Sequence, residues 1–181
     1  MLDNKNGLLE INFLINKVIK NDNDKVADLG CGKFGYFVFP LTKIIGKRGK
    51  IYAVDILKDN LESINSIARV ENLSQIETIW SNLEIYKGTK IPDNSLDVAF
   101  LVCLLHQSER YLDILKESVR MLKTGGRLLI IDWNKENFIF NKEKEIVSPE
   151  EIKEGIKKLP LDLQEEFIAG DYHYGLLLIK K

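Results

Sequence analysis

The sequence has few cysteines, no long hydrophobic run and almost no net charge. Cys31 and Cys103 are its two cysteines, and neither belongs to a CxxC pair, which argues against a disulfide framework or a structural zinc site. No segment reaches the ~18 uninterrupted apolar residues that suggest a membrane-spanning helix. The polar N-terminus also lacks the hydrophobic region of a signal peptide. We therefore expect a protein of the reducing cytoplasm that needs no membrane partner.

The charge balance and the spacing of possible metal ligands limit the binding partners that we expect. The chain has 26 Lys and Arg against 27 Asp and Glu, a balance that argues against nucleic acid as a partner. Because His, Asp and Glu do not cluster in the sequence, we expect no metal site. With 181 residues and 45% hydrophobic content, we expect one domain over residues 1–181, with an N-terminal helix and linker in 1–24 and the core in 25–181.

Apolar periodicity predicts strands that alternate with helices along most of the chain. The predicted strands are 25–29, 50–54, 75–80, 95–102 and 127–131, and the predicted helices are 8–20, 36–45, 58–70, 109–122 and 149–158. Segments 164–168 and 174–179 follow with no helix between them, which predicts an antiparallel hairpin. The order predicts an α/β fold with a doubly wound, mostly parallel seven-stranded sheet, helices on both faces and an antiparallel C-terminal hairpin. The polar stretch 134–144 predicts a mobile loop.

A glycine-rich turn follows the first predicted strand and is the most informative segment. It reads Asp28-Leu29-Gly30-Cys31-Gly32-Lys33-Phe34-Gly35, and the second strand ends twenty residues later at Asp55. Glycines let the backbone approach a ligand, and a carboxylate at the second strand can accept hydrogen bonds from two ribose hydroxyls. Asp28 would repel a pyrophosphate and suits a positively charged group. The pattern predicts a ligand with a ribose and an adjoining cationic part.

In parallel sheets of this kind, ligands bind beyond the carboxyl ends of the strands. The residues at those ends are 28–35, 55–56, 81–83, 102–107 and 132–133, and we expect the functional site to be drawn from them.

Three motifs carry a resemblance to a known family. Asp-x-Gly-x-Gly follows the first strand, Ala-Val-Asp ends the second, and Leu-Lys-x-Gly-Gly-x-Leu precedes the fifth. Together with the terminal hairpin, these motifs resemble the class I S-adenosylmethionine-dependent methyltransferases over about residues 25–180. The resemblance implies a Rossmann-like methyltransferase domain that uses S-adenosylmethionine, and its closest variety acts on small molecules.

The resemblance also implies which residues hold the cofactor. They lie at the ends of the first four strands: Asp28, Gly30, Cys31, Gly32, Gly35, Asp55, Ile56, Ser81, Asn82, Leu83 and Val102. Asp28 would hold the positive methionyl end, and Asp55 would accept the ribose hydroxyls. Ile56 and Leu83 would enclose the adenine. Asn82 stands where the family commonly has an acid that accepts from the adenine amino group, and its amide oxygen can make the same bond.

The chain departs from the family pattern at two places. Phe34 occupies the position of the third glycine, so either the loop is one residue longer, with Gly35 as the glycine, or Phe34 projects into the pocket. Segment 103–107 lacks the Asn/Asp-Pro-Pro-aromatic signature of methylation on nucleobase amino groups. The second departure argues against an adenine of DNA or RNA as the substrate.

His106, after the fourth strand, is the candidate catalytic residue. An imidazole, with a pKa near ~6.5, can act as a general base on a hydroxyl, an amine or a carbon acid. The alternative is that His106 only makes a hydrogen bond within the fold. For His173 we expect a surface or structural role. Trp80 is expected in the core, whereas Trp133 and Tyr36 are candidates to shape the access of a substrate.

Other functions stay open at this point. A nicotinamide-dependent oxidoreductase is one, because Gly30, Gly32 and Gly35 also fit G-x-G-x-x-G, although Asp28 and the lack of a Tyr-x-x-x-Lys pair argue against it. A non-catalytic S-adenosylmethionine-binding module is another, and methylation of protein or RNA is a third. A homodimer would close a pocket that a small domain leaves open on one side.

Overall fold

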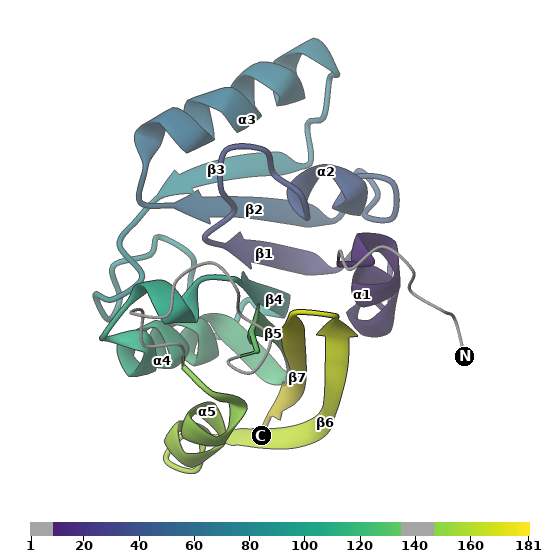
Figure 1. The fold of residues 1–181 in the computed structure, drawn as a ribbon. Helices are drawn as coiled ribbons and strands as arrows, with labels where there is room; N and C mark the ends of the chain where they lie inside the picture. The colour runs from purple at the N-terminus through teal and green to yellow at the C-terminus, as the bar shows by residue number, and fades with distance from the viewer. Residues whose placement is uncertain (1–8, 135–146) are drawn as a thin grey trace.

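The computed structural model describes residues 9–134 and 147–181, which contain one seven-stranded sheet (Figure 1). The strand order is β3-β2-β1-β4-β5-β7-β6. The strands are β1 Lys25–Leu29, β2 Lys50–Asp55, β3 Ile76–Trp80, β4 Leu96–Val102, β5 Leu122–Trp133, β6 Leu161–Gly170 and β7 His173–Lys180. Strands β1 to β5 pair in parallel, and β7 is antiparallel to both β5 and β6. The predicted fold class is therefore confirmed.

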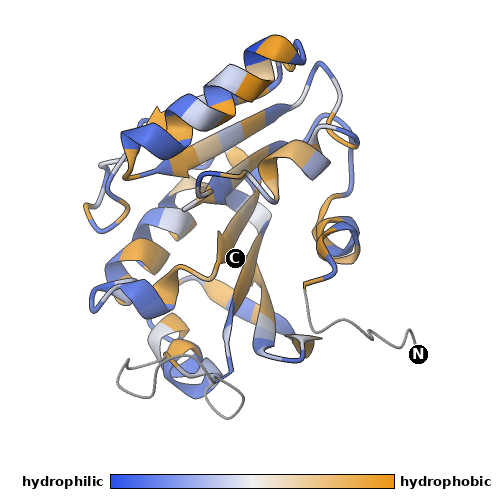
Figure 2. Cartoon of the chain, turned by 45° about the horizontal axis from the view of Figure 1, so that its top comes forward, coloured by the Kyte–Doolittle hydropathy of each residue, from blue (hydrophilic) through white to orange (hydrophobic). Residues whose placement is uncertain are grey.

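Helices cover both faces of the sheet. They are α1 Ile11–Val18, α2 Val38–Leu41, α3 Lys58–Val70, α4 Tyr111–Met121 and α5 Pro149–Ile156, with a single 3₁₀ turn at Leu105–Gln107. Buried side chains of α1, α2 and α3 pack on one face, and those of α4 and α5 pack on the other. Figure 2 shows the strands in mainly hydrophobic colours between helices that carry both colours. Two apolar layers thus enclose the sheet, as expected for strands buried on both faces.

Local sequence signals explain how several elements begin. Helix α5 starts with the predicted capping box: the hydroxyl of Ser148 accepts from the backbone N–H of Glu151 at 3.2 Å, and the Glu151 carboxylate accepts from the N–H of Ser148 at 2.8 Å. Helix α3 has the predicted bounds and buries Leu61 and Ile64. Among the helices within 9–134 and 147–181, none is long and apolar enough to cross a membrane.

Many of the predicted boundaries differ from the structure by one to a few residues, and two of the larger differences have a clear local cause. The helix predicted over 36–45 is regular only over α2, because the hydroxyl of Thr42 donates to the Phe39 carbonyl at 2.7 Å and the following N–H groups bond three residues back, which tightens the turns. Strand β5 begins at Leu122 and not at 127. Leu122 pairs with Leu96, and the register then shifts across the two glycines, so the segment predicted as a turn is a bulge within the strand.

The prediction that Trp80 is a core residue is wrong. Strand β3 lies at the edge of the sheet, and 58% of Trp80 is exposed. Its indole N–H donates to the Ile56 carbonyl at 2.8 Å, and the Lys58 ammonium lies 4.7 Å from the ring centroid. Among the described residues, the helix predicted over 8–20 is regular only over α1. Residue 8 of that prediction, and the part of the predicted loop 134–144 after Asn134, fall outside the described residues.

Candidate functional site

A cavity of about 370 Å³ lies at the carboxyl ends of β1 to β4. Its lining includes these predicted residues: Gly30, Gly32, Asp55, Ile56, Ser81, Asn82 and Leu83. The segments that follow four neighbouring strands therefore meet at one edge of the sheet, as the parallel arrangement requires.

The other predicted cofactor residues do not line this cavity. Asp28 is buried at the end of β1, and Cys31 and Val102 pack against the apolar layer of α1 to α3. Gly35 has a φ of +54° in the turn before α2. His106 also lies outside the lining.

Seven further residues line the cavity that were not among the predicted cofactor contacts: Leu57, Asn60, Glu84, Leu104, Gln107, Ser108 and Ile114. Leu104 and Gln107 belong to the strand-end segment 102–107, from which the site was expected to be drawn, although neither was assigned a role. Ile114 lies inside α4, and only the packing of that helix against the sheet brings it to the cavity. Its periodic spacing in the sequence indicates a core residue and nothing more.

The turn after β1 requires glycine at position 30. Gly30 has a φ of +84°, and a Cβ placed there would lie 2.9 Å from Cδ1 of Leu104. The N–H groups of Gly30 and Cys31 both donate to the Val54 carbonyl, at 2.8 and 3.0 Å. The turn is thus fixed to the end of β2 and leaves its backbone open to a ligand.

Asp55 connects this turn to the start of α3. One carboxylate oxygen accepts from the N–H of Gly32 at 2.9 Å, and the other accepts from the N–H of Leu57 at 2.8 Å. The side chain borders the cavity although only 7% of the residue is exposed. Each oxygen keeps a further lone pair, so the carboxylate can also accept from two hydroxyls of a ligand.

Asp28 is a buried carboxyl that no hydrogen bond reaches from the described residues. Burial, together with the smaller effect of the nearby Asp55 charge, raises its pKa from 3.8 to about 7. A cationic group bound beside it would stabilise its charged form. The turn therefore carries an acid, which a bound cation would hold in its charged form, at the place where the sequence predicts the positive end of a ligand.

The residues predicted to contact adenine lie around the cavity. Ile56 and Leu83 line it, Ile56 being exposed and Leu83 buried. The amide oxygen of Asn82 accepts from the N–H of Glu84 at 2.9 Å, which orients the side chain and leaves one lone pair for a ligand. Its contact with an adenine amino group stays a prediction.

Phe34 does not project into the cavity. The side chain is 64% exposed and its ring lies 5.6 Å from that of Tyr36, centroid to centroid.

Burial raises the pKa of the Cys31 thiol strongly, and it raises that of Cys103 to about 12. Neither cysteine is set up as a thiolate nucleophile.

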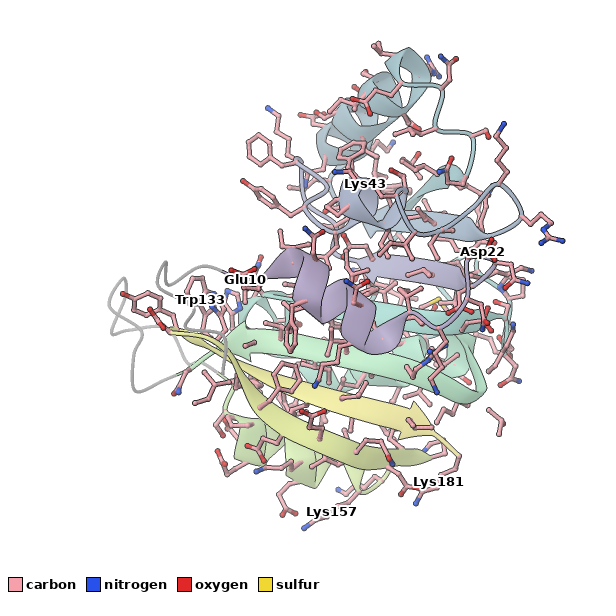
Figure 3. The ribbon with its side chains drawn as sticks, turned by 90° about the vertical axis from the view of Figure 1, so that its right-hand side faces the viewer. Glu10, Asp22, Lys43, Trp133, Lys157 and Lys181 are labelled. Carbon is pink, nitrogen blue, oxygen red and sulfur yellow. The ribbon has the colours of Figure 1, made fainter. Side chains whose placement is uncertain are left out.

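A second polar group lies further along the sheet edge, at the ends of β4 and β5. Nδ1 of His106 lies 2.7 Å from Oδ1 of Asp132, and Asp132 is fully buried. The rings of Trp133 and His173 are tilted by 34° to one another, with centroids 4.2 Å apart. Figure 3 shows Trp133 at one end of the strands, with Asp22 and Lys181 at the opposite end. His173 is buried, which fits the structural part of its prediction, and burial is the main cause of its lowered pKa.

The residues present fit a nucleoside with a cationic amino acid side. From β3 to β1 the sheet edge supplies an apolar pair, the Asp55 carboxylate, a glycine turn and a buried acid, in the order in which adenine, ribose and a positively charged chain would follow. The lone pairs of Asp55 and the open backbone at Gly30 are the specific features of this fit.

Comparisons with known proteins agree with this geometry. A family model described as a methyltransferase domain matches residues 20–170. A demethylmenaquinone methyltransferase of Lactococcus lactis is 33% identical over 110 residues, which cover 59% of this chain and 41% of the relative. A methyltransferase structure from Aquifex aeolicus, described as dependent on S-adenosylmethionine, has a TM-score of 0.82 at 23% identity and covers 97% of this chain and 92% of its own.

The similarities differ in what they show. The [4+2]-cyclase SpnF also shares the fold, with a TM-score of 0.81 at 13% identity over 94% of this chain and 80% of its own, so the fold alone does not identify the reaction. The chain spans less than half the length of the curated relatives that it matches. The family match, which covers most of the chain, favours methyl transfer over the nicotinamide-dependent alternative.

Proposed function

Because this chain belongs to the methyltransferase domain family, we propose that it transfers a methyl group from S-adenosylmethionine to a small molecule. Its fold and family are those of the class I S-adenosylmethionine-dependent methyltransferases. The observation that carries the proposal is the cavity between Asp55 and the glycine turn, where a carboxylate and open backbone lie together.

The residues that would hold the cofactor act by hydrogen bonding, packing and charge. Asp55 would accept the ribose hydroxyls, Ile56 and Leu83 would enclose the adenine, and the backbone at Gly30 and Gly32 would face the methionine portion. Asp28 would offset the positive charge of the methionyl end. S-adenosylmethionine supplies a methyl group already activated on a positively charged sulfur. The chain then has to align the acceptor and exclude water, which in favourable cases lowers a barrier by ~7–11 kcal/mol.

A small acceptor is supported by a relative. The Lactococcus lactis protein named above is a demethylmenaquinone methyltransferase, and the cavity of about 370 Å³ lies within the range of small-molecule pockets, as the cofactor requires. We place the proton acceptor of the reaction at His106, whose ring is held by Asp132. Both cysteines are free thiols, in keeping with a cytoplasmic location.

The function is tested by product formation. The purified protein is incubated with S-adenosylmethionine and a panel of small acceptors, including demethylmenaquinone under reducing conditions, and S-adenosylhomocysteine is measured by mass spectrometry. We expect its formation to depend on one acceptor and to fall at least tenfold in Asp55→Asn. Binding of NADH without binding of S-adenosylmethionine would contradict the proposal, and so would binding of S-adenosylmethionine without turnover on any acceptor.

A further inference from the structure

We propose that Asp132 is a positioning residue that holds His106 as the proton acceptor for a hydroxyl or acidic C–H group of the methyl acceptor. The inference rests on the proposed methyl-transfer function and adds to it the class of acceptor. It predicts a phenol, an enol or a related acid as substrate, in preference to an amine.

The contacts of Asp132 fix the orientation of the imidazole. Oδ1 lies 2.7 Å from Nδ1 of His106 and also accepts from the N–H of Trp133 at 2.8 Å, while Oδ2 accepts from the N–H of His106 at 3.2 Å. A carboxylate cannot donate, so the ring proton belongs on Nδ1. The other ring nitrogen, Nε2, makes no hydrogen bond within the described residues and carries the free lone pair.

The burial of Asp132 is costly and calls for an explanation. Asp132 has no exposed surface and follows the fully buried Ile130 and Ile131 along β5. A buried carboxylate is retained only where its charge is compensated, and here the compensation is two backbone N–H groups and an imidazole. An imidazole that gains a proton during the reaction would complete an ion pair with it. The buried charge of Asp132 is therefore best balanced after His106 has accepted the proton.

The pair lies on the acceptor side of the cofactor cavity. The sheet order places β4 next to β1 and β5 beyond it, on the side away from β2 and its Asp55. His106 sits in the 3₁₀ turn after β4, between Leu104 and Gln107, which line the cavity. If the cofactor extends from Asp55 across the glycine turn, its methyl end points toward this turn. An acceptor bound beyond it would meet His106.

The surrounding titratable groups leave His106 as the suitable base. Asp132 is faced by His173 from β7, by Cys103 from the end of β4 and by the phenol of Tyr174. Burial keeps His173 and both Cys103 and Tyr174 in their neutral forms, and the Tyr174 hydroxyl donates to the Val147 carbonyl at 2.9 Å. His106 is the group in this cluster that combines a hydrogen bond to Asp132 with a free lone pair.

The chemistry explains the class of acceptor. Nε2 of His106 takes the proton of the acceptor's O–H or C–H group, and the electron pair left behind forms the new bond to the methyl carbon. The electrons of the carbon–sulfur bond return to sulfur, which leaves a neutral thioether, and the imidazolium later releases its proton to water. An amine already has a lone pair and can lose its proton after the transfer, so it gains little from a base.

The first experiment reads the position of the imidazole proton by ¹⁵N NMR and needs no acceptor. The chain has two histidines, so His173→Gln assigns both signals. We expect the His106 proton on Nδ1 in the wild-type protein and a shift toward Nε2 in Asp132→Asn. The matched control is Asp97→Asn, which changes an acid on β4 that also accepts a backbone N–H, from Lys25, and pairs with Lys123. A wild-type His106 with its proton on Nε2 would overturn the proposal.

The second experiment compares acceptors and pH profiles. Phenols, naphthols and primary amines are offered with S-adenosylmethionine, and kcat is measured from pH 5 to 9. With the hydroxylated acceptors we expect kcat to fall by about 10²–10⁴ in His106→Gln, with loss of the acidic limb of the profile, and by about tenfold or more in Asp132→Asn. Asp97→Asn should keep both the rate and the profile. KM for S-adenosylmethionine should stay within about twofold in all three variants.

The outcomes separate the two proposals. Turnover of amines alone, at a rate that His106→Gln does not change, would overturn this inference and leave methyl transfer intact. Cofactor binding without turnover of any hydroxylated acceptor would also overturn it. Failure of the wild-type protein to bind S-adenosylmethionine would instead overturn the proposed function. If Asp132→Asn is poorly folded, its melting temperature shows this. The kinetics of His106→Gln and the position of the His106 proton in the wild-type protein then decide the question.

Discussion

At the scale of single residues, Asp28 couples the site to the stability of the fold. Its pKa is raised from 3.8 to about 7 by burial and by Asp55, so between these pH values the folded protein holds a proton that the unfolded chain has lost. The stability contributed by the neutral form is therefore lost as the pH rises toward 7, by on the order of 4 kcal/mol.

The variant Asp28→Asn, which cannot ionise, isolates this effect. We expect the free energy of unfolding of the variant to increase relative to that of the wild-type protein as the pH rises from about 4 to 7. Outside this range the difference between the two should stay constant. Urea denaturation over a pH series measures the difference. A difference that is constant across pH would show that Asp28 is not held in its neutral form.

Gly30 is the residue where backbone conformation and close contact act together. An alanine there meets both an unfavourable φ of +84° and the side chain of Leu104 at 2.9 Å. Gly125 provides a matched control, because its φ is +76° and nothing lies within 4 Å of the added Cβ.

We expect Gly125→Ala to cost about 1–2 kcal/mol of stability from conformation alone. Gly30→Ala should cost more, and it should also weaken S-adenosylmethionine binding at least tenfold because Leu104 lines the cavity. Thermal denaturation and calorimetry measure the two effects. Equal losses of stability in both variants, with unchanged binding in Gly30→Ala, would contradict the packing argument.

At the scale of elements, α4 holds the loop between β3 and β4 in place. Glu117 on α4 is fully buried, and its carboxylate accepts from the N–H groups of Lys87 and Thr89 and from Arg120 through two bonds of 2.8 Å. Burial opposes the charged form, but these hydrogen bonds outweigh it and lower the pKa of Glu117. The loop starts at the residues Ser81–Leu83 that line the cavity.

Removal of this carboxylate should loosen the loop. We expect Glu117→Ala to cost about 3 kcal/mol or more, because Arg120 and two N–H groups lose their buried partner. Glu154→Ala, which removes an exposed acid paired with Lys157, should change stability by no more than about 0.5 kcal/mol. Since the Glu117 pKa is lowered, its carboxylate stabilises the fold above the ordinary Glu pKa, and this stabilisation is lost as the pH falls. The free energies of unfolding of Glu117→Ala and Glu154→Ala should therefore become more alike in acid. Urea denaturation at pH 7 and pH 3 tests both statements.

The elements also show why some features could be predicted and others could not. Strand β1 and helix α3 were predicted with the observed bounds, because a continuous apolar run and a regular helical spacing are local signals. The bulge at the start of β5 depends on its pairing with β4, which the spacing of residues 122–127 does not reveal. The shortened α2 depends on a side-chain hydroxyl that competes for a backbone carbonyl.

At the scale of the whole molecule, the sheet order decides what each strand end can contribute. The order β3-β2-β1-β4-β5 brings the predicted strand ends to one edge, and motif spacing together with parallel topology was enough to predict this. The exposure of Trp80 follows from the edge position of β3, and the contribution of Ile114 follows from the packing of α4. Neither can be read from the sequence, because both are properties of neighbours distant along the chain.

The central claim is that the edge between Asp55 and the glycine turn binds S-adenosylmethionine, and calorimetric titration of that compound tests it most directly. The wild-type protein should bind it with 1:1 stoichiometry, and Asp55→Ala should weaken binding about tenfold to a hundredfold or more, through the loss of charge-assisted hydrogen bonds. The exposed neighbour in Asp59→Ala should leave the affinity unchanged, and melting temperatures confirm that each variant is folded. A wild-type protein that does not bind the compound, or a folded Asp55→Ala that binds it as tightly as the wild type, would contradict the account.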